Sequence, residues 1–119
     1  MRILFPQDPL KAAVADGPFV DEKAACERLG IACSLFDFDA LAHAPLKPRP
    51  AIDAGEQILY RGWMLKPADY AVLTQKIERG GGIPVTSAAN YALSHHIDGW
   101  YDACRDLTPK TVLLRSDDD

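Results

Sequence analysis

Short apolar runs alternate with longer segments of helical periodicity along the chain, and this pattern predicts strands separated by helices. Five runs have the length of strands and show little alternation of apolar and polar residues, which is typical of strands buried on both faces. They are "RILF" (2–5), "IACSLFDFD" (31–39), "QILYR" (57–61), "IPVTS" (83–87) and "TVLL" (111–114). Pro6 ends the first run, because proline has no N–H to continue a central strand.

Four segments carry helix signals. They are "VDEKAACERLG" (20–30), "KPADYAVLTQKIERGGG" (66–82), "AANYALSHH" (88–96) and "GWYDACRDL" (99–107). Asp21, Ser87 and Asp98 are the predicted N-caps of the first, third and fourth helices, and Pro67 suits the first turn of the second. Residues 42–56 are rich in proline and predict an extended surface connection.

The alternation of strands and helices predicts an α/β fold. We expect a small, open, mainly parallel sheet of about five strands with helices on both faces, as in Rossmann-like domains, and right-handed crossovers between the strands. A chain of 119 residues has the length of one domain with one core, so residues 1–119 are expected to form a single α/β domain.

Polar residues that follow the predicted strands are the candidates for a binding site, because ligands of open α/β sheets lie beyond the carboxyl ends of the strands. The candidates from the first four strands are Gln7, Asp8, Asp37, Asp39, Arg61, Gly62, Trp63, Thr86 and Ser87. The free N–H groups of the helix that Ser87 caps favour an anion at the same edge. The pattern therefore predicts an anionic ligand at this edge.

Arg61 admits two interpretations. Its guanidinium can hold a carboxylate or phosphate through two parallel hydrogen bonds, or it can pair with Asp8 or Asp37 and tie the strand ends together. Trp63 likewise suits either a packed strand–helix junction or a platform on which a ligand stacks. Asp37 binds a cation, pairs with Arg61 or is simply solvated.

His95 and His96 are adjacent on a predicted helix, so their side chains point about 100° apart and cannot readily share one metal ion. No carboxylate stands at the spacing of a zinc-binding helix, and we expect no metal site. One of the two histidines is expected to pack under Trp100 or to face the edge of the sheet. The three cysteines contain no CxxC pair and predict neither a disulfide framework nor a zinc site.

Composition narrows the choice of partners. The net charge is −4 and the 13 basic residues form no cluster, which argues against a general nucleic-acid-binding protein. No apolar stretch approaches the length of a signal peptide core or of a membrane span. We therefore expect a cytoplasmic protein without nucleic-acid or membrane partners.

Four stretches together resemble the N-terminal portion of an uncharacterised bacterial and phage branch of the ATP-grasp superfamily, known as the pre-ATP-grasp domain. They are "MRILFPQDPL", "LFDFDAL", "LYRGWMLKPADYAVL" and "VTSAANYALSHHIDGWYDACRDLTPKTV". The resemblance implies that Arg61 and Trp63 lie on the substrate side of a cleft, with His95 and His96 near the passage into a catalytic half. In that family ATP and Mg²⁺ are held by lobes that follow this portion. No matching lysines and carboxylates come after residue 114, so we expect no cofactor in this chain and no ligation by it alone.

Three functions remain as hypotheses. The first is a non-catalytic or substrate-side component of an ATP-grasp carboxylate–amine ligase that binds a small anion or docks a catalytic half. The second is an acidic binding module, such as an immunity or regulatory protein, for a basic protein partner. The third is a stand-alone enzyme in which Asp8, Asp37 and a histidine act as acid and base. An exposed sheet edge or apolar surface also allows a homodimer.

Overall fold

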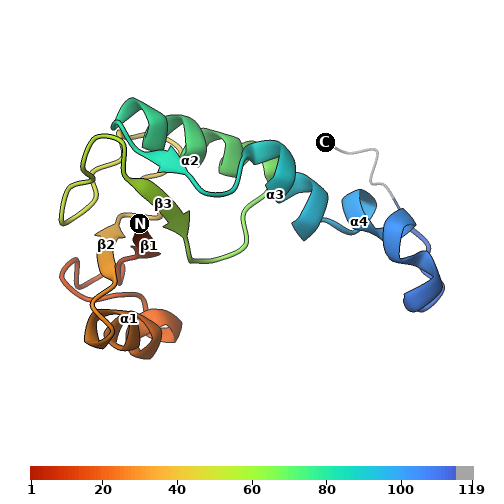
Figure 1. Ribbon diagram of the computed structural model, residues 1–119, viewed down its shortest axis with the longest axis horizontal. Helices are drawn as coiled ribbons and strands as arrows, with labels where there is room; N and C mark the ends of the chain where they lie inside the picture. The colour runs from red at the N-terminus through yellow and green to blue at the C-terminus, as the bar shows by residue number, and fades with distance from the viewer. Residues whose placement is uncertain (115–119) are drawn as a thin grey trace.

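The fold is built on a four-stranded, all-parallel sheet (Figure 1). The structure is a computed structural model that describes residues 1–114. Its strands are β1 (Arg2–Pro6), β2 (Ala32–Phe36), β3 (Gln57–Tyr60) and β4 (Ile83–Pro84), in the order β2-β1-β3-β4. Arg2 aligns with Ala32 of β2 on one side and with Ile58 of β3 on the other. The α/β fold with a parallel sheet is confirmed.

Helices cover both faces of this sheet, as predicted. The 3₁₀ turn η1 (Gly17–Phe19) and helix α1 (Val20–Arg28) lie on one face, and α2 (Pro67–Arg79) lies on the other, above the strands in Figure 1. Pro67 occupies the first turn of α2, where the missing N–H costs nothing.

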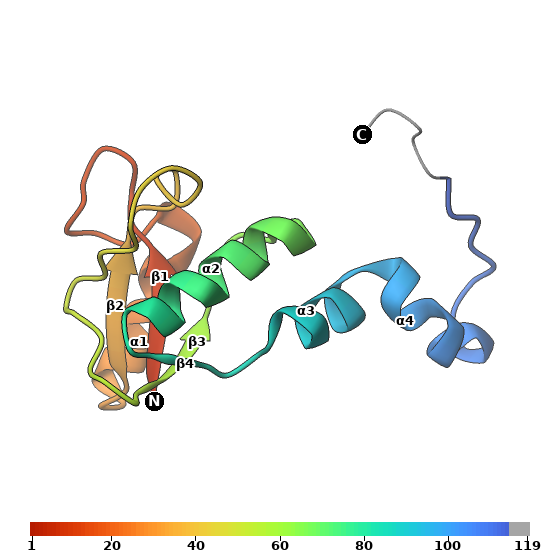
Figure 2. The same ribbon diagram turned by 90° about the horizontal axis from the view of Figure 1, so that it is seen from above.

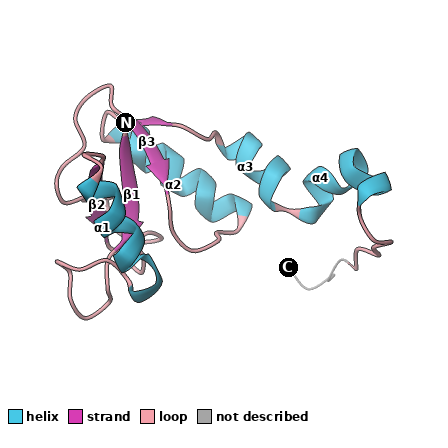
Figure 3. Ribbon diagram, turned by 60° about the horizontal axis from the view of Figure 1, so that its bottom comes forward, coloured by secondary structure: helices cyan, strands magenta, loops and turns pink. Residues whose placement is uncertain are grey.

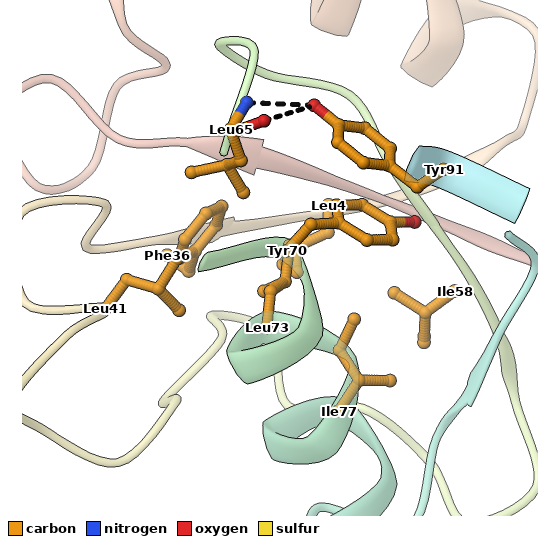
Figure 4. Packing of buried hydrophobic residues seen from close by; sticks show 9 residues of the cluster. All are labelled: Leu4, Phe36, Leu41, Ile58, Leu65, Tyr70, Leu73, Ile77 and Tyr91. Atoms are coloured by element: carbon orange, nitrogen blue, oxygen red, sulfur yellow. Dashed lines mark hydrogen bonds between the residues drawn. The ribbon is translucent and has the colours of Figure 1, made fainter. Parts of the chain in front are cut away.

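The side chains of β1 alternate between two hydrophobic cores, one under each helical layer. Leu4 packs toward α2, in the cluster drawn in Figure 4. That cluster contains Leu4, Phe36, Leu41, Ile58, Leu65, Tyr70, Leu73, Ile77 and Tyr91. Ile3 and Phe5 pack toward α1, against Phe19 and Leu35. β1 is buried along its whole length because it is central and covered on both faces.

A buried ionic network closes the amino end of the sheet. Arg2 is only 9% exposed, and its Nε donates to Glu56 at 2.8 Å while a terminal nitrogen donates to Ser34 Oγ at 3.0 Å. Ser34 Oγ donates in turn to the carbonyl of Pro50. The network ties the β2–β3 connection, which carries Pro50 and Glu56, to strands β1 and β2.

The predicted fifth strand over 111–114 is wrong. These residues are exposed, form no ladder and follow η2 (Arg105–Leu107) at the far end of the molecule. Their apolar run has strand propensity, but no sheet edge lies within reach to pair with it (Figure 2). β4 is therefore the edge strand on this side of the sheet.

Helices α3 (Ala88–His95) and α4 (Ile97–Cys104) form an arm that projects away from the sheet (Figures 2 and 3). The radius of gyration is 16.1 Å, compared with about 13.5 Å expected for a compact domain of this length. No helix among residues 1–114 has the length and apolar character needed to span a membrane.

Two of the three predicted helix caps are wrong and one is confirmed. Ser87 caps α3, since its side chain accepts a hydrogen bond from Asn90 N at 3.1 Å. Asp21 and Asp98 instead lie in the first turns of α1 and α4, which begin two residues earlier than these caps imply. η1 runs directly into α1, and α4 starts immediately after His96, so neither aspartate stands at the boundary.

Candidate functional site

A groove of about 410 Å³ opens beyond the carboxyl ends of β3 and β4. It is lined by Leu59, Tyr60, Arg61, Gly62, Trp63, Met64, Tyr70, Thr86, Tyr91 and His95. Its walls come from the end of β3, the turn that follows it, Tyr70 of α2, Thr86 and the helix α3. This Arg61 groove brings together five of the candidate residues, namely Arg61, Gly62, Trp63, Thr86 and His95.

The Arg61 side chain contacts η1 and α1, which lie on the face of the sheet opposite to α2. Its Nε donates to Glu22 Oε1 at 2.7 Å, and its guanidinium lies 5.4 Å from the centre of the Phe19 ring. The expected pairing with Asp8 or Asp37 is not formed, because the turn after β3 directs the side chain toward α1. Among residues 1–114 the terminal nitrogens of the guanidinium have no hydrogen-bond partner, and half of the side chain is exposed. Arg61 is therefore positioned by one contact and keeps donors for another.

Trp63 is anchored at the same junction. Its Nε1 donates to Asp16 Oδ2 at 2.7 Å, and its ring meets Phe19 edge to face at 5.3 Å. The indole is nevertheless 44% exposed, so one part of it is packed and another part lines the groove. The packed-junction interpretation is confirmed by these contacts, and the stacking platform stays a prediction.

The turn that carries these two residues depends on a close approach between Gly62 and Tyr60. A Cβ at position 62 would lie 2.6 Å from the Tyr60 hydroxyl oxygen, which is too close for any side chain. The Tyr60 hydroxyl donates to the Trp63 carbonyl at 2.6 Å. Gly62 therefore lets the chain fold over the phenol and brings Arg61 and Trp63 to the same groove.

A stack of three rings forms the wall opposite the turn. Tyr70 and Tyr91 are parallel, with centres 3.7 Å apart, and His95 continues the stack at 4.1 Å from Tyr91. The Tyr91 hydroxyl donates to the Leu65 carbonyl and accepts from Leu65 N at 2.8 Å (Figure 4). The Tyr70 hydroxyl donates to the carbonyl of Thr86. The two inner rings are therefore fixed at both ends.

Burial favours the neutral phenols of Tyr60 and Tyr70. Desolvation raises the pKa of Tyr60 far above its ordinary value, and the neighbouring Tyr91 and Tyr70 phenols increase the shift. Burial also raises the pKa of Tyr70, although its hydrogen bond to Thr86 opposes the change. Deprotonated phenolates are thus disfavoured, and the groove offers neutral hydroxyls around one guanidinium.

The two histidines have different surroundings. His95 is exposed, lines the Arg61 groove, and has Nδ1 within 3.1 Å of Ser94 Oγ. His96 stands at the start of α4 with its ring edge-on to Tyr91, and its buried Nε2 finds no hydrogen-bond partner within residues 1–114. The expectation that one histidine faces the sheet edge is met by His95, and the contact with Trp100 is not formed.

The other predicted residues do not converge on this groove. Gln7 and Asp37 line a separate hollow of about 230 Å³ beside β2. Asp8 accepts hydrogen bonds from the backbone of Leu10 and Lys11 and stabilises its own turn.

Asp8 and Asp37 lie apart from His95. The geometry therefore does not bring together the acid and the base that the stand-alone enzyme hypothesis requires. Ser87 lies next to the groove residue Thr86, and its hydroxyl is used by the α3 cap.

A larger hollow, of about 550 Å³, lies elsewhere. Phe38, Asp39, Lys66 and Asp69 are among its lining residues, so two carboxylates accompany its one cation. The Arg61 groove is smaller but contains a cation and no carboxylate among its lining residues. We therefore regard the Arg61 groove as the better anion site.

The sequence interpretation missed the tyrosines of the groove and Glu22. Tyr91 and His95 are four residues apart on one helix, a spacing that places their rings side by side, and this signal was present in the sequence. Tyr60 ends a predicted strand and belonged to the same edge. Glu22 lies 39 positions before Arg61, and no local pattern relates the two residues.

Residues 1–114 contain no group of three or more His, Cys, Asp or Glu side chains that could hold a metal ion. Comparisons with protein families, with curated proteins and with solved structures found no match. The resemblance to the pre-ATP-grasp domain therefore stays a prediction, and the geometry of the groove carries the functional argument.

Proposed function

We propose that this protein is a non-catalytic, substrate-side domain that binds a small carboxylate or phosphate in the Arg61 groove. The observation that carries the proposal is the hydrogen bonding of the Arg61 guanidinium. Glu22 accepts only from Nε, the terminal nitrogens have no partner among the described residues, and Arg61 is one of the residues that line the groove. A planar guanidinium with two adjacent free donors matches the oxygen spacing of a carboxylate or phosphate.

The contact with Glu22 is compatible with this role. The pair is exposed on both sides, with 50% of the Arg61 side chain and 38% of the Glu22 side chain accessible. An exposed pair of this kind contributes little to stability, so its main effect is to orient the guanidinium. An incoming anion gains hydrogen bonds to the free nitrogens and does not have to displace Glu22.

The resemblance to the pre-ATP-grasp domain supports the same edge of the sheet. In such an arrangement the groove faces a catalytic half, and ATP and Mg²⁺ are bound by that half. We expect this chain to contribute recognition of the acid substrate and to leave phosphoryl transfer to the partner.

Titration of the ¹⁵N-labelled protein with succinate and with inorganic phosphate tests the proposal. The largest shifts are expected at the amides of Arg61, Gly62 and Trp63. Arg61→Ala should weaken binding by about tenfold or more, because a charge-assisted hydrogen-bond pair is lost. Arg28→Ala is the matched control, since Arg28 is exposed on α1 and outside the groove. Equal binding by Arg61→Ala and the wild type would reject the proposal.

A second candidate function is an acidic module that binds a basic protein. The arm favours it, because Asp98, Asp102 and Asp106 lie on or next to α4 beside the exposed Leu107. Such a complex would weaken strongly as salt is added. Affinity purification at low salt should then recover one basic protein in stoichiometric amount, and recovery of none would count against this candidate.

A further inference from the structure

The ring stack in the Arg61 groove specifies the ligand more closely than its charge alone. This inference rests on the proposed function, because it concerns the same groove and the same anion. We propose that the ligand is a planar aromatic acid whose carboxylate or phosphate binds Arg61 while its ring stacks on the exposed face of His95.

The first step is the rigidity of the stack. Tyr70 and Tyr91 are each only 4% exposed, and both hydroxyls are fixed by hydrogen bonds to backbone groups. Their ring planes differ by 5°, and the His95 plane differs from that of Tyr91 by 16°. The orientation of His95 is thus set before any ligand arrives, and a preorganised surface loses little entropy on binding.

The second step is the open end of the stack. One face of the His95 ring lies on Tyr91, while the residue as a whole is exposed and lines the groove. The opposite face has no aromatic neighbour among residues 1–114. A planar ring placed there would become the fourth member of a parallel series. Parallel stacking favours a flat ring over a puckered ring of the same size.

The third step is the composition of the remaining walls. Trp63 and Met64 supply exposed apolar surface next to Arg61, with 44% and 63% of each residue accessible. A groove of about 410 Å³ matches the size of small-molecule sites. Apolar walls with a single cation suit a molecule with one anionic end and one flat apolar body.

The decisive comparison uses two acids of equal charge, one with a planar aromatic ring and one with a puckered saturated ring. Phenylacetate and cyclohexylacetate carry the same charge and a six-membered ring of similar size, and acetate carries the charge alone. We expect phenylacetate to bind the wild-type protein about three- to tenfold more tightly than cyclohexylacetate. The ring protons of His95 should shift upfield with phenylacetate and stay unchanged with cyclohexylacetate.

Substitutions at His95 assign this preference to the stack. His95→Ala should abolish the difference between the two ligands, whereas His95→Phe, which keeps a planar ring, should retain it. His43→Ala is the matched control, because His43 is also exposed but lies outside the Arg61 groove. Circular dichroism verifies that each variant is folded. The ligand comparison on the wild type decides the question even when a variant fails to fold.

The outcomes separate this inference from the proposed function. Equal affinity for phenylacetate and cyclohexylacetate, with both dependent on Arg61, overturns the aromatic inference and leaves anion binding in place. Absence of binding by every carboxylate and by phosphate overturns both. Uridine monophosphate and ribose 5-phosphate provide the same comparison for a phosphate ligand, and a preference confined to that pair assigns the anion as a phosphate.

Discussion

At the scale of single residues, the groove depends on a position that carries no side chain. Gly62 permits the Tyr60 hydroxyl to reach the Trp63 carbonyl, and this hydrogen bond fixes the turn that aims Arg61 and Trp63. In the sequence, Gly62 is recognisable only as a turn signal. Its structural role becomes clear from the Tyr60 ring, which packs against it.

Gly62→Ala should destabilise the protein by about 1–3 kcal/mol, because the new methyl group overlaps the Tyr60 ring and the turn must shift. Urea unfolding monitored by tryptophan fluorescence measures the loss. Gly17→Ala is the matched control, since a Cβ at Gly17 meets nothing within 4 Å. Equal unfolding midpoints for the two variants would contradict the steric argument.

Glu56 gives a pH-dependent contribution to stability. Its hydrogen bond from Arg2 lowers the pKa of the carboxyl below the ordinary value of 4.5, although burial acts in the opposite direction. A carboxyl whose pKa is lower in the folded state stabilises the fold above its ordinary pKa. This contribution is lost as the pH falls below 4.5 and through the folded pKa.

The wild type should therefore be more stable than Glu56→Gln at pH 7, and the difference should shrink as the pH falls from 4.5 toward 3. Urea unfolding of both proteins across this range measures the change. Glu27→Gln serves as the control, because Glu27 is exposed and pairs only with Lys23 one helical turn away. A difference that is constant with pH would show that Glu56 acts through packing and not through its charge.

At the scale of elements, strands and helices that carry their own signal were predictable. The buried run of β1 and the Tyr70, Leu73 and Ile77 stripe of α2 are local patterns, and both elements form where expected. Residues 111–114 have the same apolar character but no neighbouring strand. A strand forms only when a neighbouring strand pairs with it, so apolar runs alone predict too many strands.

Some residues of the candidate site were predictable from the sequence, and their contacts were not. The rule that ligands lie beyond the carboxyl ends of strands selected Arg61 and Trp63, and both line the groove. It also selected Asp8 and Asp37, whose carboxylates are used within their own turns. The pairing of Arg61 with Glu22 joins distant segments and could not be inferred from spacing.

At the scale of the whole molecule, packing is uneven between the sheet and the arm. α2 buries Tyr70, Leu73, Thr74 and Ile77 against the sheet, whereas α4 has no buried residue and contacts chiefly α3 and η2. The face of α4 that carries Trp100 remains half-buried. Local stability follows the apolar area that each element buries.

Hydrogen exchange should therefore separate the two regions. The amides of α4 are expected to exchange much faster than those of α2, because α4 opens without disrupting the sheet. Mass spectrometry of peptides from 67–79 and 97–104 measures the contrast in the full chain. Exchange at equal rates would indicate that the arm is held by contacts beyond those within residues 1–114.

The edge strand β4 affects how copies of this chain meet at high concentration. Ile83 and Val85 donate their N–H groups inward to β3, so Pro84 and Thr86 present the outer rim. Pro84 has no N–H to offer, and the Thr86 carbonyl is already used by Tyr70. Two of the four backbone groups of these residues are thus unavailable to a strand from another molecule. The rim thus discourages fibril growth while leaving the neighbouring groove open to solvent.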